Sequence, residues 1–254
     1  FRNSMCLACG APLGYEPGLG RIHALLAGPR PGTWRLAGAP DDASLFRRCA
    51  NFDSPAGCNW LLPAAHPSAH CVACRLNRTI PDLTDPDNAR YWRAIENAKR
   101  RLIAQLLAVG LPVASKVEED PQRGVMFDFL RTPACGPKVM TCHGQGLITL
   151  NIEEADDATR EKIRQQMNEP YRTLLGHFRH EIGHYYWDRL IAGTPWQEKF
   201  RALFGDERAD YTAALQRSYQ QGPPPDWRDH HISAYAASHP WEDWAETWSH
   251  YLQI

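Results

Sequence analysis

The sequence predicts an α+β chain, with a mostly helical part and a small β-sheet at residues 81–254 and an irregular cysteine-containing module at residues 1–80. After residue 81, apolar residues recur at helical spacing over several long stretches, and only three short runs have the character of strands. Before it, cysteines lie among glycines and prolines with little apolar periodicity. We therefore expect two domains, 1–80 and 81–254.

Composition limits the partners and the cellular compartment that we expect for the protein. A net charge of -1 gives no electrostatic reason to expect nucleic acid or an anionic membrane as a partner. No stretch approaches the roughly eighteen apolar residues that a membrane helix needs. Most of the eight cysteines are spaced as metal ligands, which suits a reducing compartment, so we expect a cytoplasmic location.

Cys6 and Cys9, in the run Cys6-Leu7-Ala8-Cys9-Gly10, have the spacing of a zinc-knuckle turn. Two thiolates across a tight turn can reach one metal ion, but a tetrahedral site needs two more ligands. No residue between Gly10 and Arg48 supplies them. We therefore expect a partial structural site, and a turn that holds no metal is the alternative.

Cys49, Cys58, Cys71 and Cys74 form a complete set of four soft ligands, spaced C-x8-C-x12-C-x2-C. Their segment is interrupted by glycine and proline, so we expect one structural zinc to hold it in place of a hydrophobic core. Two disulfides are the alternative. Zinc ribbons often bind nucleic acid or proteins. The arginines nearby form only a thin basic patch, which leaves a protein partner as the expectation.

A long helix should begin at Asp85-Pro86 and stop at Gly110. Its apolar residues recur at helical spacing and identify it as a packing helix; the polar residues expected on the opposite face are Arg93, Glu96, Lys99 and Arg100. Short strands and a charged surface helix should follow, with the strands at Pro112–Glu118, Val125–Leu130 and Leu147–Ile152 and the helix at Glu153–Asn168.

The next predicted helix, Tyr171–Ala192, contains His180-Glu181-Ile182-Gly183-His184, an HExxH motif. Histidines four residues apart lie one helical turn apart, so both imidazoles can bind one zinc ion. Glu181 then lies beside the open coordination position, where it can take a proton from water. The alternative is a core helix with two hydrogen-bonded histidines.

A catalytic zinc needs a third protein ligand, and Glu207 and Glu242 are the candidates. We expect both on helices, opened by Gly205-Asp206 and by Pro240. We prefer Glu242 because Glu246, one turn later, can hydrogen-bond a ligand histidine. Tyr235 lies seven residues before Glu242 and can donate to the oxyanion of a tetrahedral intermediate. An ordinary buried tyrosine is the alternative for Tyr235.

Long stretches of the chain resemble the bacterial zinc-binding metallopeptidases that carry an N-terminal zinc-ribbon region. The stretches are MCLACGAPLG, CRLNRTIPDL, GLITLNI, EPYRTLLGHFRHEIGHYYWDRLI, FGDERADY and SAYAASHPWEDWAETWSHYL. The resemblance implies a zincin-like, gluzincin-type peptidase domain with a cytoplasmic zinc-ribbon appendage and His180 and His184 as ligands. The spacing Tyr235-x6-Glu242-x3-Glu246 is also similar to the metal-side helix of anthrax-lethal-factor-type peptidases. Family members usually show a further CxxC upstream of FRNSMCLACG.

The expected activity is zinc-dependent hydrolysis of peptide bonds in a peptide or protein substrate, with one catalytic and one or two structural zinc ions. Two other functions stay open. One is a zinc-ribbon binding or regulatory protein with an inactive peptidase domain. The other is a zinc amidase or isopeptidase with the same chemistry.

Overall fold

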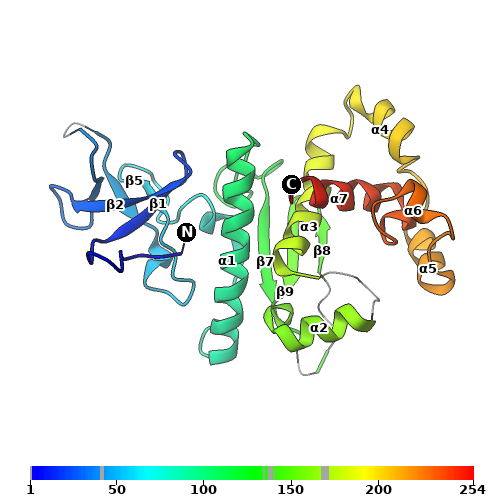
Figure 1. Cartoon of the computed structure of the whole chain (residues 1–254), viewed down its shortest axis with the longest axis horizontal. Helices are drawn as coiled ribbons and strands as arrows, with labels where there is room; N and C mark the ends of the chain where they lie inside the picture. Colours follow the sequence, from blue (N-terminus) through cyan, green and yellow to red (C-terminus); the bar gives the residue numbers. More distant parts are fainter. Residues whose placement is uncertain (1, 41–42, 134, 137–138, 140, 167–171) are drawn as a thin grey trace. The chain divides into compact units, whose positions relative to one another are not determined.

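The computed structural model describes the chain except residues 1, 41–42, 134, 137–138, 140 and 167–171 (Figure 1). Its helices and two β-sheets confirm the α+β class. The chain divides into two compact units, one made of Phe1–Thr141 with Thr149–Leu174 and the other of Cys142–Ile148 with Leu175–Ile254. The domain boundary at residue 80 stays a prediction. Among the described residues, no helix combines the length and the hydropathy that a bilayer-spanning segment needs.

The N-terminal module is an ordered sheet, so the expectation of an irregular module was wrong. Five strands pair in the order β1-β2-β3-β4-β5, antiparallel throughout: Leu13–Glu16, Arg21–Ala27, Trp34–Leu36, Phe46–Arg48 and Leu61–Pro63. A small core of Leu25, Leu36 and Leu61 lies against it. Three of the strands have only three residues each, which is too short for the alternating apolar pattern by which a strand is recognised in sequence.

Helix α1, Pro86–Ala108, begins as predicted, with the Asp85 carboxylate accepting the Asp87 amide at 2.9 Å. Its polar face differs from the prediction. Glu96, Lys99 and Arg100 are all buried. The Lys99 ammonium lies 2.6 Å from the Glu96 carboxylate and over the ring of Phe129. The helix therefore packs on both sides, because these charges satisfy one another within the first unit.

The second sheet has the order β6-β7-β9-β8, with β8, Cys142–Gly144, as an edge strand. β6, Asn77–Thr79, runs parallel to β7, Met126–Leu130. β9 covers Leu147–Asn151, so the last two predicted strands are confirmed. The strand expected at Pro112–Glu118 is wrong, since that segment turns and makes one isolated bridge, from Ser115 to Val125.

The charged segment forms a short 3₁₀ turn, Ile152–Ala155, and helix α2, Asp157–Gln166. Asn168 and Tyr171, where one helix was expected to end and the next to begin, lie outside the described residues. The second unit holds the remaining helices, which are α3 (Leu174–Leu190), α4 (Trp196–Phe204), α5 (Tyr211–Gln221), α6 (Trp227–His230) and α7 (Pro240–Tyr251). Within that unit α3 and α7 lie side by side (Figure 1).

Candidate metal centres

Gly183, inside the HExxH motif, sets how closely α7 approaches α3. A Cβ at this position would lie 3.2 Å from both the Ala245 Cα and the Trp248 ring, which is tighter than ordinary contact. The Trp244 indole donates a hydrogen bond to the Gly183 carbonyl at 2.8 Å. The missing side chain therefore lets the first turn of α7, which carries Glu242, lie beside the histidines of α3.

His180, His184 and Glu242 bring three donor atoms together. The Glu242 Oε2 atom lies 3.0 Å from the His180 Nε2 and 3.6 Å from the His184 Nε2. Ligands about 2.05 Å from a tetrahedral zinc would lie about 3.3 Å apart, so these separations bracket that value. The same Oε2 is buried and has no hydrogen-bond partner among the described residues. The arrangement therefore fits a zinc ion better than it fits a set of direct hydrogen bonds.

Two of the three candidate ligands, His180 and Glu242, are held by a partner on their other side. The Glu246 carboxylate lies 2.7 Å from the His180 Nδ1 atom, which leaves Nε2 for the metal. The Ser233 hydroxyl donates to the other Glu246 oxygen at 2.7 Å. The Tyr211 hydroxyl donates to Glu242 Oε1 at 2.5 Å, which leaves Oε2 for the metal. These contacts fix the direction in which His180 and Glu242 present their lone pairs.

The electrostatics of this cluster also favour a cation. Burial alone would lower the pKa of His180, but the adjacent Glu242 and Glu246 carboxylates outweigh it and raise that pKa well above its ordinary value. Burial alone would raise the pKa of Glu242, but contacts with His180 and His184 hold it well below the usual range. The carboxylate is therefore ionised at a point where positive charge is stabilised.

Glu181 and Tyr235 lie at the same centre. Glu181 is buried on α3 directly after His180. The Tyr235 ring lies 5.9 Å from the His180 ring, centroid to centroid. Burial and the nearby Glu242 carboxylate raise the pKa of Tyr235, so its hydroxyl stays protonated and able to donate. The structure thus brings together all six residues that the sequence assigned to this centre.

Glu207 lies apart from the three ligands. It is in a turn between α4 and α5, and the helix expected to open at Gly205-Asp206 begins instead at Tyr211, with Asp210 as its cap. The Glu207 carboxylate pairs with Arg201 and accepts a hydrogen bond from Gln197 at 2.7 Å. The neighbouring Arg208 pairs with Asp206 at 2.8 Å. These hydrogen bonds hold Glu207 in an ion pair.

Three further residues of this centre carried no usable signal in the sequence. His143, on the edge strand β8, stacks on His184 with centroids 6.1 Å apart. The Trp241 ring lies 4.1 Å from the His184 ring. Tyr211, the first residue of α5, donates its hydroxyl to Glu242 on α7. All three reach the centre through tertiary packing, which no spacing rule describes.

The second centre consists of Cys49, Cys58, Cys71 and Cys74, all buried, with their sulfur atoms within 4.8 Å of one another. The Cys58 and Cys71 sulfurs lie 3.7 Å apart. Zinc–sulfur bonds of about 2.3 Å predict a sulfur–sulfur separation of about 3.8 Å, whereas a disulfide requires about 2.05 Å. None of the four forms a disulfide, so the disulfide alternative is wrong.

The pKa values of the four thiols also favour a bound cation at this centre. Burial raises the pKa of Cys71 well above its ordinary value. Hydrogen bonds from the neighbouring thiols lower the pKa of Cys49 instead. The four thiols compete for protons, and only a metal ion would keep all of them as thiolates.

Helix α1 supplies charges beside this second centre. The Glu96 carboxylate lies 3.8 Å from the Cys74 sulfur. The Arg100 guanidinium lies 3.7 Å from Glu96 and donates to the Ala56 carbonyl at 3.0 Å. Four thiolates and a zinc ion carry a formal charge of about −2; the Arg100 guanidinium interacts with these thiols, while Lys99 offsets the Glu96 carboxylate. The cysteines are thus tied to the long helix of the same unit.

Cys6 and Cys9 form a turn closed by the Gly10 amide, which donates to the Cys6 carbonyl at 2.9 Å. Gly10 has a φ of 71°, which a residue with a side chain rarely adopts. In the described part of the chain, the clusters of three or more potential ligands are the cysteine quartet and the His180 centre. The first zinc site therefore stays a prediction.

Comparison with known proteins agrees with both centres. The family described as "Putative zinc-binding metallo-peptidase" matches residues 88–254, and a family described as "zinc-ribbon domain" matches residues 1–85. Two proteins named only as uncharacterized, from Mycobacterium bovis and Mycobacterium tuberculosis, are each 44% identical to this chain over 255 residues, which cover 100% of it and 69% of the relative. No solved structure matches. The chain belongs to the putative zinc-binding metallo-peptidase family and carries an N-terminal zinc-ribbon domain.

Proposed function

We propose that the chain hydrolyses peptide bonds with one zinc ion held by His180, His184 and Glu242. The observation that supports this most directly is the orphaned Glu242 Oε2 atom, 3.0 and 3.6 Å from the two imidazole nitrogens. A buried carboxylate oxygen with two ring nitrogens around it and no hydrogen-bond partner needs a cation to offset its desolvation.

Zinc and Glu181 have separate roles in the proposed reaction. When bound, zinc polarises a carbonyl and lowers the pKa of a water toward about 7. Glu181 accepts a proton from the attacking water, whose oxygen adds to the carbonyl carbon. As the carbon–nitrogen bond breaks, Glu181 returns that proton to the leaving amine, so the products are a carboxylate and a free amine. Its position directly after His180 suits this role.

Tyr235 is the proposed donor to the negative charge that develops on the carbonyl oxygen. Its phenol is buried, is kept protonated by its surroundings, and belongs to the turn that leads into α7. Removing one such preorganised donor lowers the rate by about a hundred- to a thousandfold. Glu246, Ser233 and Tyr211 do not contact the substrate in this scheme and act by orienting the ligands.

The structural part of the proposal is a second zinc ion bound by the four cysteines. With zinc bound, all four thiols would be deprotonated and would bind the ion in one tetrahedral site. The cytoplasmic location and the protein partner of the zinc-ribbon domain remain predictions of the sequence.

The decisive experiment compares the wild type with Glu181→Gln. The amide keeps the shape of the side chain and cannot accept the proton. Zinc content should stay the same while peptide hydrolysis falls by about a hundredfold or more. A Gln variant that cleaves peptides at the wild-type rate would refute the mechanism.

Two further measurements address the alternative functions. Zinc content that is unchanged in a His180→Ala, His184→Ala double variant would favour a binding protein with an inactive peptidase domain. A substrate panel that includes isopeptides and small amides separates a peptidase from an amidase. Hydrolysis of only the isopeptides would move the assignment to the second class.

A further inference from the structure

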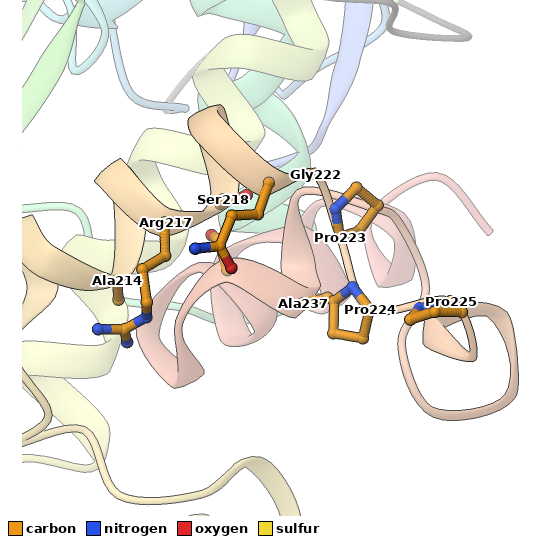
Figure 2. Close-up of a pocket in the computed structure, with 10 residues that line it drawn as sticks. Ala214, Arg217, Ser218, Gly222, Pro223, Pro224, Pro225 and Ala237 are labelled. Carbon is orange, nitrogen blue, oxygen red and sulfur yellow. The ribbon is translucent and has the colours of Figure 1, made fainter.

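A pocket of about 350 Å³ lies in the second unit, between the C-terminal half of α5 and the loop that follows it. Figure 2 shows Arg217 on the helix side and the Pro223–Pro225 run on the other. Ala237 and Ser238 also line it, from the 3₁₀ turn that Tyr235 opens. The pocket is therefore built from two elements that also carry residues of the proposed catalytic centre.

The pocket continues the helix face that presents Tyr211 to Glu242. Ala214, Ser218 and Gln221 line the pocket and lie three, seven and ten residues after Tyr211. Positions at this spacing share one face of a helix. Seven residues of helix advance about 10 Å, which is the length of about three residues of extended peptide.

The lining also has a charge preference. Arg217 is exposed, and it has no ion-pair or hydrogen-bond partner among the described residues. No acidic residue belongs to the described lining. The three consecutive prolines have no amide hydrogens, and they form a stiff wall that can pack against an aliphatic stem. A guanidinium and an apolar wall that line one pocket suit a carboxylate carried on a short hydrocarbon chain.

We propose that this pocket is a substrate subsite that binds a carboxylate of the peptide about three residues from the bond that is cut. The inference rests on the proposed peptidase function and adds a substrate class to it. The carboxylate belongs either to an aspartate or glutamate side chain or to the C-terminus of the peptide. Arg217 would pair with it, and the Ser218 hydroxyl lies on the same pocket wall.

The test uses the full zinc-loaded chain and pools of synthetic dodecapeptides. In each pool, one position is fixed as glutamate or as its neutral analogue glutamine. A second set places the scissile bond three residues from the C-terminus, with that terminus either free or amidated. The variants are Arg217→Gln and Arg217→Glu. Arg228→Gln is the matched control, because Arg228 is also exposed in the second unit but packs over Trp227.

The wild type should cleave the glutamate pools about five- to tenfold faster than the glutamine pools at one position about three residues from the cut. This size suits a partly exposed charge pair, and the preference should weaken at high salt. Arg217→Gln should abolish the preference, Arg217→Glu should reverse it so that the glutamine pools are cleaved faster, and Arg228→Gln should retain it. A preference for the free over the amidated terminus would identify the C-terminal carboxylate as the source.

Binding measurements separate this proposal from the proposed function. The same glutamate and glutamine pools are titrated against the Glu181→Gln variant, with and without Arg217→Gln. If no pool is cleaved but the glutamate pools bind more tightly in an Arg217-dependent way, the proposed hydrolysis fails and the subsite stands. If peptides are cleaved with equal rates for glutamate and glutamine, or if Arg217→Gln keeps the preference, the subsite is refuted and the hydrolysis stands.

Discussion

Replacing Tyr211 with phenylalanine should weaken zinc binding at the His180 centre without unfolding the protein. The Tyr211 hydroxyl donates to Glu242 Oε1 at 2.5 Å, and the Glu242 side chain is only 1% exposed. Removing this donor leaves one oxygen of a buried carboxylate without its partner. The other oxygen, Oε2, is the proposed ligand atom, so the carboxylate loses the contact that holds it in orientation.

The size of the effect follows from the charge on the acceptor. A hydrogen bond to a charged group contributes about 1.5–3 kcal/mol. Each 1.4 kcal/mol corresponds to about a tenfold change in a dissociation constant, so the zinc dissociation constant should rise about ten- to a hundredfold. Residues that orient metal ligands in other proteins have effects of about the same size.

Competition with a chromophoric chelator at pH 7 measures this constant while the cysteine quartet stays loaded. Tyr219→Phe is the control, because Tyr219 lies on the same helix but is 63% exposed. Tyr235→Phe should keep its zinc and lose turnover, since a donor to the substrate acts only during the reaction. The reasoning fails if Tyr211→Phe binds zinc within twofold of the wild type, or if Tyr235→Phe loses zinc as strongly.

Two other predictions address the ligand sets. Glu242→Ala should remove zinc from the His180 centre, which metal analysis measures. Glu207→Ala should retain that zinc and lower the free energy of unfolding by about 1 kcal/mol in chemical denaturation, because its ion pair with Arg201 is broken. The opposite pattern would make Glu207 the ligand. Cys74→Ser should reduce the zinc content by one ion per chain and lower the melting temperature; an unchanged zinc content would show that the quartet binds no metal.

The sequence could single out the candidate ligands because ligand spacing within a helix is a local property. His180 and His184 lie one turn apart on any helix, and Glu242 and Glu246 repeat that spacing on another. The structure places both pairs at one centre. The cysteine quartet was predicted for a similar reason, since four soft ligands within one short segment are a distinctive combination.

The tertiary structure decided which polar groups are buried and what lies beside them. Glu96 and Lys99 were predicted on the polar face of α1, opposite its apolar residues, and the structure buries both in one ion pair. No role at this centre was predicted for Tyr211, yet its hydroxyl reaches Glu242 from a different helix. Periodicity assigns a residue to a face of its own helix, but what covers that face depends on how elements distant in sequence pack together, and that is set by the whole fold.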